Sequence, residues 1–282
     1  MLILRKISEL RKFVEKQKAD KKKVGFVPTM GALHRGHLSL ISECKKNNPV
    51  TIASIFVNPQ QFNDLSDYKK YPRTESADLK LFKEKGCTAV FCPDEKTIYP
   101  EPPLLKFSFG TLEQVMEGAH RPGHFNGVAL VVSKLFNLVT PDTAYFGQKD
   151  LQQFLIIKKM VSDLGFNIKL NCCPIIRDKD GLALSSRNVL LSNDERKAAP
   201  ELYKGLCNAR NLLMKGQSIS QAKKTVQGIF RNHSFIRLQY FEIADHKTLA
   251  EVKNLNDHEN VALCIAAFLG KVRLIDNVFL KM

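Results

Sequence analysis

The sequence predicts an α/β protein: a Rossmann-like, doubly wound parallel sheet domain followed by a smaller C-terminal α+β domain. Two observations predict this class. As far as residue 175, short apolar segments rich in β-branched residues alternate with helical segments, as strands and crossover helices do in a parallel sheet. Beyond residue 190, helical segments are followed by three long strand-like segments, which is the order of an α+β unit. We therefore expect domains at residues 1–177 and 178–282.

The first strand leads into a turn that carries two histidines. Residues 24–27 (VGFV) form a short buried strand, which Pro28 is expected to end because proline has no backbone donor. The next helical pattern begins at His37, so His34 precedes the helix and His37 lies in its first turn. Both histidines thus lie where a strand passes into a helix, the place where open α/β sheets bind ligands.

The remaining elements follow from apolar periodicity and from Gly and Pro stops. Apolar residues at positions 3, 7, 10 and 14 predict a surface helix at the N-terminus. In the first part, strands are expected at 50–57, 88–92, 144–146 and 168–172, and helices at 76–85, 127–139 and 150–164. In the second part, residues 194–231 predict two helices, the first capped by Asn193 or Asp194, before strands at 236–244, 261–269 and 272–280.

Composition and charge narrow the class of protein. The chain has 282 residues, of which 44% are hydrophobic, and a formal net charge of +15. Its lysines are scattered and do not form a stripe with interleaved aromatics, so we expect neither nucleic acid nor a membrane as a partner. The N-terminus lacks the apolar run of a signal peptide and has too many acids for a transit peptide. The seven cysteines show no CxxC pair and no zinc spacing, which favours free thiols in a cytoplasmic protein.

The turn around the two histidines favours an anion site. A helix N-terminus attracts anions through its free backbone N–H groups and the helix dipole. Imidazoles at that point can donate hydrogen bonds to phosphate oxygens and stabilise charge that grows in a transition state. Gly31 and Gly36 permit a positive φ or the close approach of a ligand to the backbone.

Two more segments carry side chains suited to phosphates. Ser185, Ser186 and Arg187 would suit a loop that closes over a triphosphate, although the same residues are also typical of an ordinary Ser-rich turn. Their donors have no partner that is evident in the sequence, so we expect this loop to be loosely held without a ligand. Lys149 can reach phosphates, and Asp150 is either a helix N-cap or a carboxylate beside magnesium.

A further strand end places uncharged amides at the rim of the sheet. In residues 55–62 (IFVNPQQF), paired amides such as Gln61 suit a hydroxylated carboxylic acid better than a phosphate. The sequence has no Walker motif, GxGxxG or GxSxG. A triphosphate bound without a P-loop indicates nucleotidyl transfer instead of γ-phosphoryl transfer.

These motifs, in this order, resemble the pantoate–β-alanine ligase (pantothenate synthetase) family of the HxGH nucleotidyltransferase superfamily. The resemblance rests on PTMGALHRGH, IFVNPQQF, YPRT, HRPGHFNGV, YFGQKDLQQ and LSSRN, and it runs from Val24 to the C-terminal RLIDN. It implies that pantoate attacks the α-phosphate of Mg-ATP to give pantoyl adenylate and pyrophosphate. The amine of β-alanine then displaces AMP to form pantothenate. The family also implies a homodimer.

The resemblance also implies residue roles. His34 and His37 would contact the ATP phosphates and stabilise the transition state, with Lys149 and Arg187 as the other catalytic residues. Pantoate would be held by Met30, Gln61 and Gln153. The remaining ATP contacts would come from Met30, Gly147, Asp150, Leu184, Ser185 and Ser186, and Mg²⁺ would lie mainly on phosphate oxygens. Residues 1–177 would bind the nucleotide and pantoate, and residues 178–282 would close over the site.

The chain departs from the family pattern at two positions, and one rival function stays open. Leu184 replaces the usual Met, and Leu151 replaces an aromatic residue that is common after the Asp. Both changes keep the position apolar, so they concern the adenine pocket or packing. The rival is another HxGH adenylyltransferase that acts on a phosphate ester. Such an enzyme would need a cationic acceptor pocket at the positions where Gln61 and Gln153 are expected, so the two amides argue against it. A nucleic-acid-binding protein is suggested by charge alone.

Overall fold

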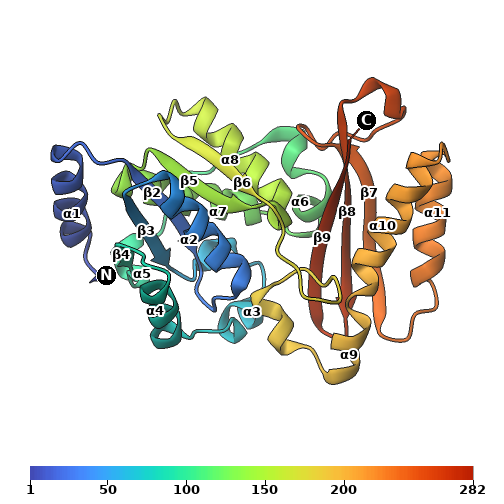
Figure 1. Cartoon of the computed structure of the whole chain (residues 1–282), viewed down its shortest axis with the longest axis horizontal. Coiled ribbons are helices and arrows are strands. Elements are labelled where there is room, and N and C mark those ends of the chain that lie inside the picture. The colour runs from blue at the N-terminus through green and yellow to red at the C-terminus, as the bar shows by residue number, and fades with distance from the viewer. Residues whose placement is uncertain (282) are drawn as a thin grey trace.

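The computed structural model describes residues 1–281, which form two sheets side by side (Figure 1). The first is a six-stranded parallel sheet in the order β1-β4-β3-β2-β5-β6. Its strands are β1 (Leu2–Leu4), β2 (Val24–Thr29), β3 (Val50–Ile55), β4 (Ala89–Phe91), β5 (Thr143–Gly147) and β6 (Lys169–Cys173). From β2, the chain adds β3 and β4 on one side of the sheet and then β5 and β6 on the other, so a switch point lies between β2 and β5. In an open parallel sheet, such a switch point leaves a crevice at the carboxyl ends of the strands.

Helices cover both faces of this sheet. One face packs on α1 (Ile7–Ala19), α7 (His124–Val139) and α8 (Leu151–Asp163), and the other on α2 (Arg35–Asn47) and α4 (Glu75–Glu84). Strand side chains alternate between the two cores as the pleat requires: Phe26, Ile52 and Phe91 face the first, and Val27, Ala53 and Val90 the second. The connections contain η1 (Pro59–Gln61), α3 (Leu65–Lys70), α5 (Glu95–Ile98), η2 (Gly110–Glu113), α6 (Met116–His120) and η3 (Gln148–Asp150).

The second sheet is antiparallel and three-stranded, in the order β7-β8-β9. The elements of this part are η4 (Ser186–Leu190), α9 (Asn193–Ala198), α10 (Glu201–Met214), α11 (Ile219–Phe230), β7 (Ile236–Asp245), η5 (Leu255–Asp257), β8 (Asn260–Leu269) and β9 (Val272–Lys281). Helices α10 and α11 cover one face (Figure 1). The other face packs on α6 and α8, where Ala262 and Cys264 meet Met116, Leu151 and Leu155.

This architecture confirms the predicted fold class, a doubly wound α/β part followed by a smaller α+β part. Three details of the prediction are wrong. Pro28 lies inside β2 and does not end it; the strand tolerates proline there because its pairing with β5 covers only Gly25 and Phe26. Residues 2–4 form an edge strand beside β4 and not the start of a helix.

The third error concerns the start of the helical region in the second part. Its first helical segment is divided into α9 and α10, which meet at Pro200. The cap of α9 is Ser192, whose hydroxyl accepts the Glu195 N–H, and neither Asn193 nor Asp194 caps it. Over the described range, residues 1–281, the helices are too short or too polar to cross a membrane.

Candidate active site

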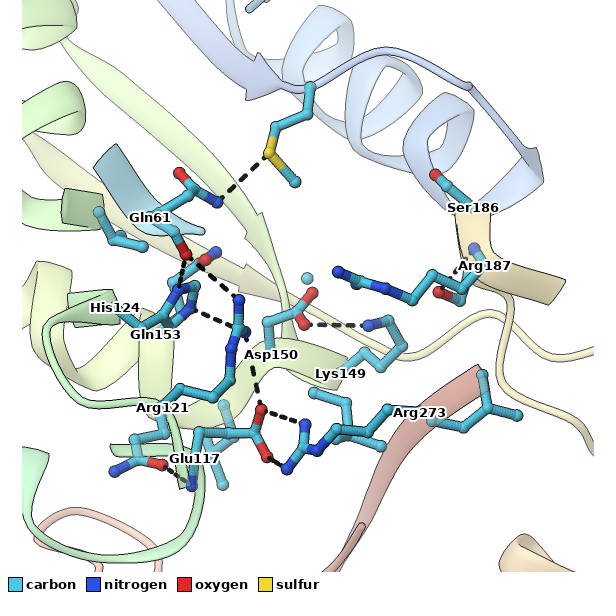
Figure 2. Close-up of a pocket in the computed structure, with 18 of the residues that line it drawn as sticks. Gln61, Glu117, Arg121, His124, Lys149, Asp150, Gln153, Ser186, Arg187 and Arg273 are labelled. Atoms are coloured by element: carbon cyan, nitrogen blue, oxygen red, sulfur yellow. Dashed lines mark hydrogen bonds and ion pairs between the residues drawn. The ribbon is translucent and has the colours of Figure 1, made fainter. Parts of the chain in front are cut away.

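A cavity of about 980 Å³ opens between the switch point of the parallel sheet and strand β9. Every residue predicted for the site lines it: Met30, His34, His37, Gln61, Gly147, Lys149, Asp150, Gln153, Leu184, Ser185, Ser186 and Arg187. Figure 2 shows side chains from the turns and helices at the edge of the parallel sheet, together with Arg273 of β9, around this one space. The fold thus brings together residues from the ends of β2, β3 and β5 with a loop of the second part.

The two predicted histidines lie at the start of α2, with His34 as its N-cap. Nδ1 of His34 accepts the Gly36 N–H at 3.1 Å, and Nδ1 of His37 accepts the His34 N–H at 3.4 Å. Since a backbone N–H can only donate, each Nδ1 must be an acceptor, and the ring proton is on Nε2. Burial lowers the pKa of His34 to about 4 and that of His37 to about 3. Near neutral pH both rings are therefore uncharged donors through Nε2.

A buried carboxylate that sequence reasoning missed holds the turn before these histidines. Asp78, on α4 and 1% exposed, accepts the N–H groups of Ala32 and Leu33 at 2.9 and 2.8 Å. Gly31 has φ +79°, and a Cβ there would lie only 3.0 Å from this carboxylate. The glycine is needed because the backbone turns and approaches Asp78 at the same point.

The amide of Gln61 is fixed before any ligand arrives. Its Oε1 accepts Asn58 Nδ2 at 3.0 Å, and its Nε2 points toward Met30 Sδ at 3.3 Å. Helix α7 approaches this segment closely, because a Cβ on Gly127 would overlap the carbonyl oxygen of Gln60. The Nε2 donor of Gln61 is thus directed at the cavity beside Met30 (Figure 2).

Lys149 and Asp150 lie together at the turn from β5 to α8. The lysine Nζ is 2.9 Å from Asp150 Oδ1. Burial alone would raise the pKa of Asp150, but Lys149 and the nearby Arg187 lower it on balance. Asp150 occupies the N-cap position of α8, yet its side chain makes no capping hydrogen bond. The side chain therefore does not fill the predicted N-cap role; it lines the cavity and pairs with Lys149.

The loop of Ser185, Ser186 and Arg187 closes one side of the cavity. Ser186 Oγ donates to Ala32 O at 2.8 Å, and Arg187 pairs with Asp67 of α3 at 3.0 Å. Ser186 and Arg187, whose partners are not evident in the sequence, are thus both paired within the protein. No local pattern can indicate these two partners, because both lie more than a hundred positions away along the chain.

A buried polar network under Gln61 was also missed, although the motif HRPGHFNGV contains two of its members. His124 Nδ1 donates to Gln61 O at 2.8 Å, and its Nε2 faces Arg121 Nη1 at 3.1 Å. Glu117 accepts two hydrogen bonds from Arg273 of β9, both at 2.6 Å, and one from Tyr240 at 2.9 Å. Figure 2 shows that this chain runs from β9 through Glu117 and Arg121 to the Gln61 carbonyl.

The His124 geometry leads to a prediction about pH and stability. Burial and then Arg121 lower the pKa of His124 to about 3, since a second ring proton would face the guanidinium. The unfolded chain takes up this proton near pH 6.5 and the folded chain does not, so stability falls as the pH drops below 6.5. Between pH 6.5 and 5, this proton should lower the free energy of unfolding of the parent by about 2 kcal/mol. We expect His124→Gln, which keeps a donor for Gln61 O, to remove that part of the decrease.

The measurement is the free energy of unfolding in urea at several pH values. His120→Gln, which changes an exposed ring on neighbouring α6, is the matched control. An equal slope of stability against pH in the parent and in His124→Gln would contradict the assignment.

Comparisons with known proteins agree with this geometry. The family model described as Pantoate-beta-alanine ligase matches residues 2–279. The chain is 48% identical over 281 residues to a pantothenate synthetase of Bacteroides fragilis, with 100% of this chain and 99% of that protein covered. It is 46% identical over 279 residues to one from Cytophaga hutchinsonii, with 99% of each covered.

Solved structures give the same result. A pantothenate synthetase from Thermus thermophilus superposes with a TM-score of 0.93 at 41% identity, covering 99% of both chains. A pantoate-beta-alanine ligase from Francisella tularensis, complexed with beta-gamma ATP and beta-alanine, has a TM-score of 0.81 at 35% identity, covering 99% of this chain and 97% of that one. With the family model and the relatives each spanning nearly the whole chain, this protein belongs to the pantoate–beta-alanine ligase family of ATP-dependent ligases.

Proposed function

We propose that the protein condenses pantoate with β-alanine and converts ATP to AMP and pyrophosphate through a pantoyl-adenylate intermediate. In the first step a pantoate carboxylate oxygen attacks the α-phosphorus of ATP, and the bond to pyrophosphate breaks. In the second step the β-alanine amine attacks the acyl carbon, loses a proton and expels AMP. The observation that carries the proposal is that His34 and His37, each with Nδ1 as an acceptor and Nε2 left as the donor, line the same cavity as the Gln61 amide.

The phosphates would lie against the start of α2. Neutral imidazoles donate there without repelling Lys149, and the helix N-terminus adds further N–H groups. Lys149 and Arg187 would supply positive charge, and Ser185 and Ser186 further donors. The donors are fixed before the reaction, so they can stabilise the charge of the transition state without reorganising.

The rest of the nucleotide would lie along the β5 turn. We propose that Gly147 and Asp150 contact the ribose and that Leu184 lines the adenine side. A Cβ on Gly147 would meet no atom within 4 Å, which leaves room for a ligand beside that backbone.

Pantoate would lie at the apolar end of the cavity. Met30 and Gln61 meet there, and Gln153 lines the same space from α8. The side chain of Val132 and neighbouring residues of α7 complete an apolar wall. An uncharged amide can bind a hydroxyl or a carboxylate, whereas a phosphate ester would favour cations.

Magnesium would be held mainly by the phosphates. Among residues 1–281, no three His, Cys, Asp or Glu side chains are grouped as metal ligands, and Asp150 already pairs with Lys149. With few protein carboxylates available, the cavity fits an ion that keeps its waters and binds through phosphate oxygens, as Mg²⁺ commonly does. Its contribution would be to neutralise phosphate charge.

We propose that residues 1–177 bind the nucleotide and pantoate and that residues 178–282 close over them. Separate hydrophobic cores support this division, since the core under β7–β9 is built from residue 182 onward. A cytoplasmic location is proposed from the pattern of free cysteines, and a homodimer from the family resemblance. Pantoate and β-alanine are the proposed partners besides ATP.

Pyrophosphate release tests the function. The purified protein should release pyrophosphate when ATP, Mg²⁺ and pantoate are present, and should form pantothenate and AMP once β-alanine is added. Release with a phosphate ester in place of pantoate would favour another HxGH adenylyltransferase. Nucleic-acid binding with no pyrophosphate release would favour a binding protein.

A prediction concerns how pantoate is distinguished from analogues. An analogue that lacks one hydroxyl should react poorly, because a buried amide left without a partner costs roughly 1 to 3 kcal/mol. In Gln153→Ala this penalty should shrink, and kcat/KM for both compounds gives the measurement. An undiminished penalty would show that another group reads the hydroxyls. The control is Gln60→Ala, which removes the exposed amide next to Gln61 in η1 and should leave the penalty as in the parent.

A further inference from the structure

Strand β9 presents alternate side chains to the two parts of the molecule. Val272, Leu274, Val278 and Leu280 enter the core beneath α10 and α11. Arg273, Ile275 and Asn277 alternate with them and line the cavity. The period of two in a strand thus directs polar groups of the second sheet at the site of the first.

Asn277 is the member of this set that touches the lysine turn. Its Nδ2 donates to Gln148 O at 2.9 Å and to Lys149 O at 3.1 Å, and its Oδ1 accepts Gln148 Nε2 at 3.0 Å. The side chain is 3% exposed, and both of its N–H groups and its oxygen are engaged. A fully engaged buried amide fixes the backbone that it contacts.

Asn277 is itself held from behind. Arg177 forms two hydrogen bonds with Asp276, at 2.5 and 2.9 Å, and donates to Asn277 O at 3.2 Å. The Arg177 guanidinium also lies 3.7 Å from the centre of the Tyr203 ring. Through these contacts, Arg177 links β9 beside Asn277 to the segment after β6 and restrains the position of the amide.

We propose that Asn277 is a positioning residue of the ATP site, which places Lys149 by holding the backbone carbonyls of Gln148 and Lys149. The proposal rests on the proposed function, in which Lys149 binds phosphate. Asn277 contacts the backbone and leaves the lysine side chain free to enter the cavity, where it meets Asp150. The second sheet thereby sets the position of a residue carried by the first.

The side chain of Asn277 can be changed at constant size. In Asn277→Asp the two donors become an acceptor, and a carboxylate would face two carbonyl oxygens at about 3 Å. The turn must shift, and a displacement of about 1 Å of a group that aligns the reactants can remove much of the rate gained from that alignment. We expect adenylate formation to slow roughly 10- to 50-fold, while pantoyl adenylate and β-alanine react at nearly the parent rate.

A double-mutant cycle separates positioning from a general structural role. Adenylate formation is measured in single turnovers for the parent, Asn277→Asp, Lys149→Ala and the double variant. If Asn277 acts through Lys149, its substitution should cost less than about threefold once the lysine side chain is absent. Equal fold-losses with and without Lys149, or equal damage to both half-reactions, would overturn the proposal.

Two controls complete the design. Gln148→Leu removes one bond to Asn277 but leaves both carbonyl contacts, and it should keep adenylate formation within about threefold. Asn277→Ala, which buries no charge, gives the same cycle if the Asp variant does not fold. The Kd for ATP in the same set of variants gives a readout that does not need pantoate. If the parent releases no pyrophosphate, the proposed function fails, whereas an additive cycle in ATP affinity counts against the role of Asn277.

Discussion

His37→Ala is expected to slow pantoyl-adenylate formation about 100- to 1000-fold while changing ATP affinity far less. Its Nδ1 is occupied by the His34 N–H, so Nε2 is the one donor this ring can direct at a ligand. A donor fixed where charge grows contributes mainly to the transition state. The measurements are the single-turnover rate with pantoate and the Kd for ATP.

The matched comparison is His37→Gln, whose amide can still present an N–H to the cavity. It should recover part of the lost rate, and His34→Ala should lose a similar amount to His37→Ala with more loss of ATP binding. A folded His37→Ala variant that turns over within a few-fold of the parent would remove the central role of this residue.

Arg187→Ala should damage the two half-reactions unequally. If Arg187 serves the triphosphate, adenylate formation should fall about 100- to 1000-fold, since a charged clamp on the phosphates is lost. Supplying pantoyl adenylate and β-alanine bypasses the triphosphate, so that step should run at close to the parent rate. Arg187→Lys should already be costly, because lysine lacks the planar fork that binds two oxygens at once.

The Asp67 ion pair supplies a control for this prediction. To bind phosphate, the Arg187 guanidinium must exchange or share the Asp67 carboxylate that lies 3.0 Å away. Asp67→Asn weakens that competitor, so it should leave adenylate formation within a few-fold and lower the KM for ATP. Equal damage to both half-reactions in Arg187→Ala would mean that the loop supports the site as a whole.

Local sequence patterns predicted the architecture because each element is specified by its own residues. The alternation of β-branched strands and amphipathic helices gives the doubly wound sheet, and its switch point explains why the ends of β2 and β5 meet. His34 could be proposed from its own motif, whereas the roles of Lys149 and Arg187 rested mainly on the family resemblance.

The supporting residues could not be predicted in the same way. Asp78 occupies an amphipathic helix, where an isolated carboxylate has the same appearance in sequence as any solvated one. Glu117 and Arg273 lie 156 positions apart, and Asn277 acts on a turn 129 positions earlier. Such pairings depend on how the two sheets pack, and this packing leaves no period in the chain. The same limit hid the partners of Ser186 and Arg187.

The path of the pantoate oxygens tests the central claim most directly. Pantoate carrying ¹⁸O in both carboxylate positions is incubated with ATP, Mg²⁺ and β-alanine, and the ¹⁸O content of each product is measured by mass spectrometry. Attack on the α-phosphorus predicts one ¹⁸O in AMP and one in the amide carbonyl of pantothenate. Label in inorganic phosphate, with ADP as the nucleotide product, would show γ-phosphoryl transfer and contradict the adenylate mechanism.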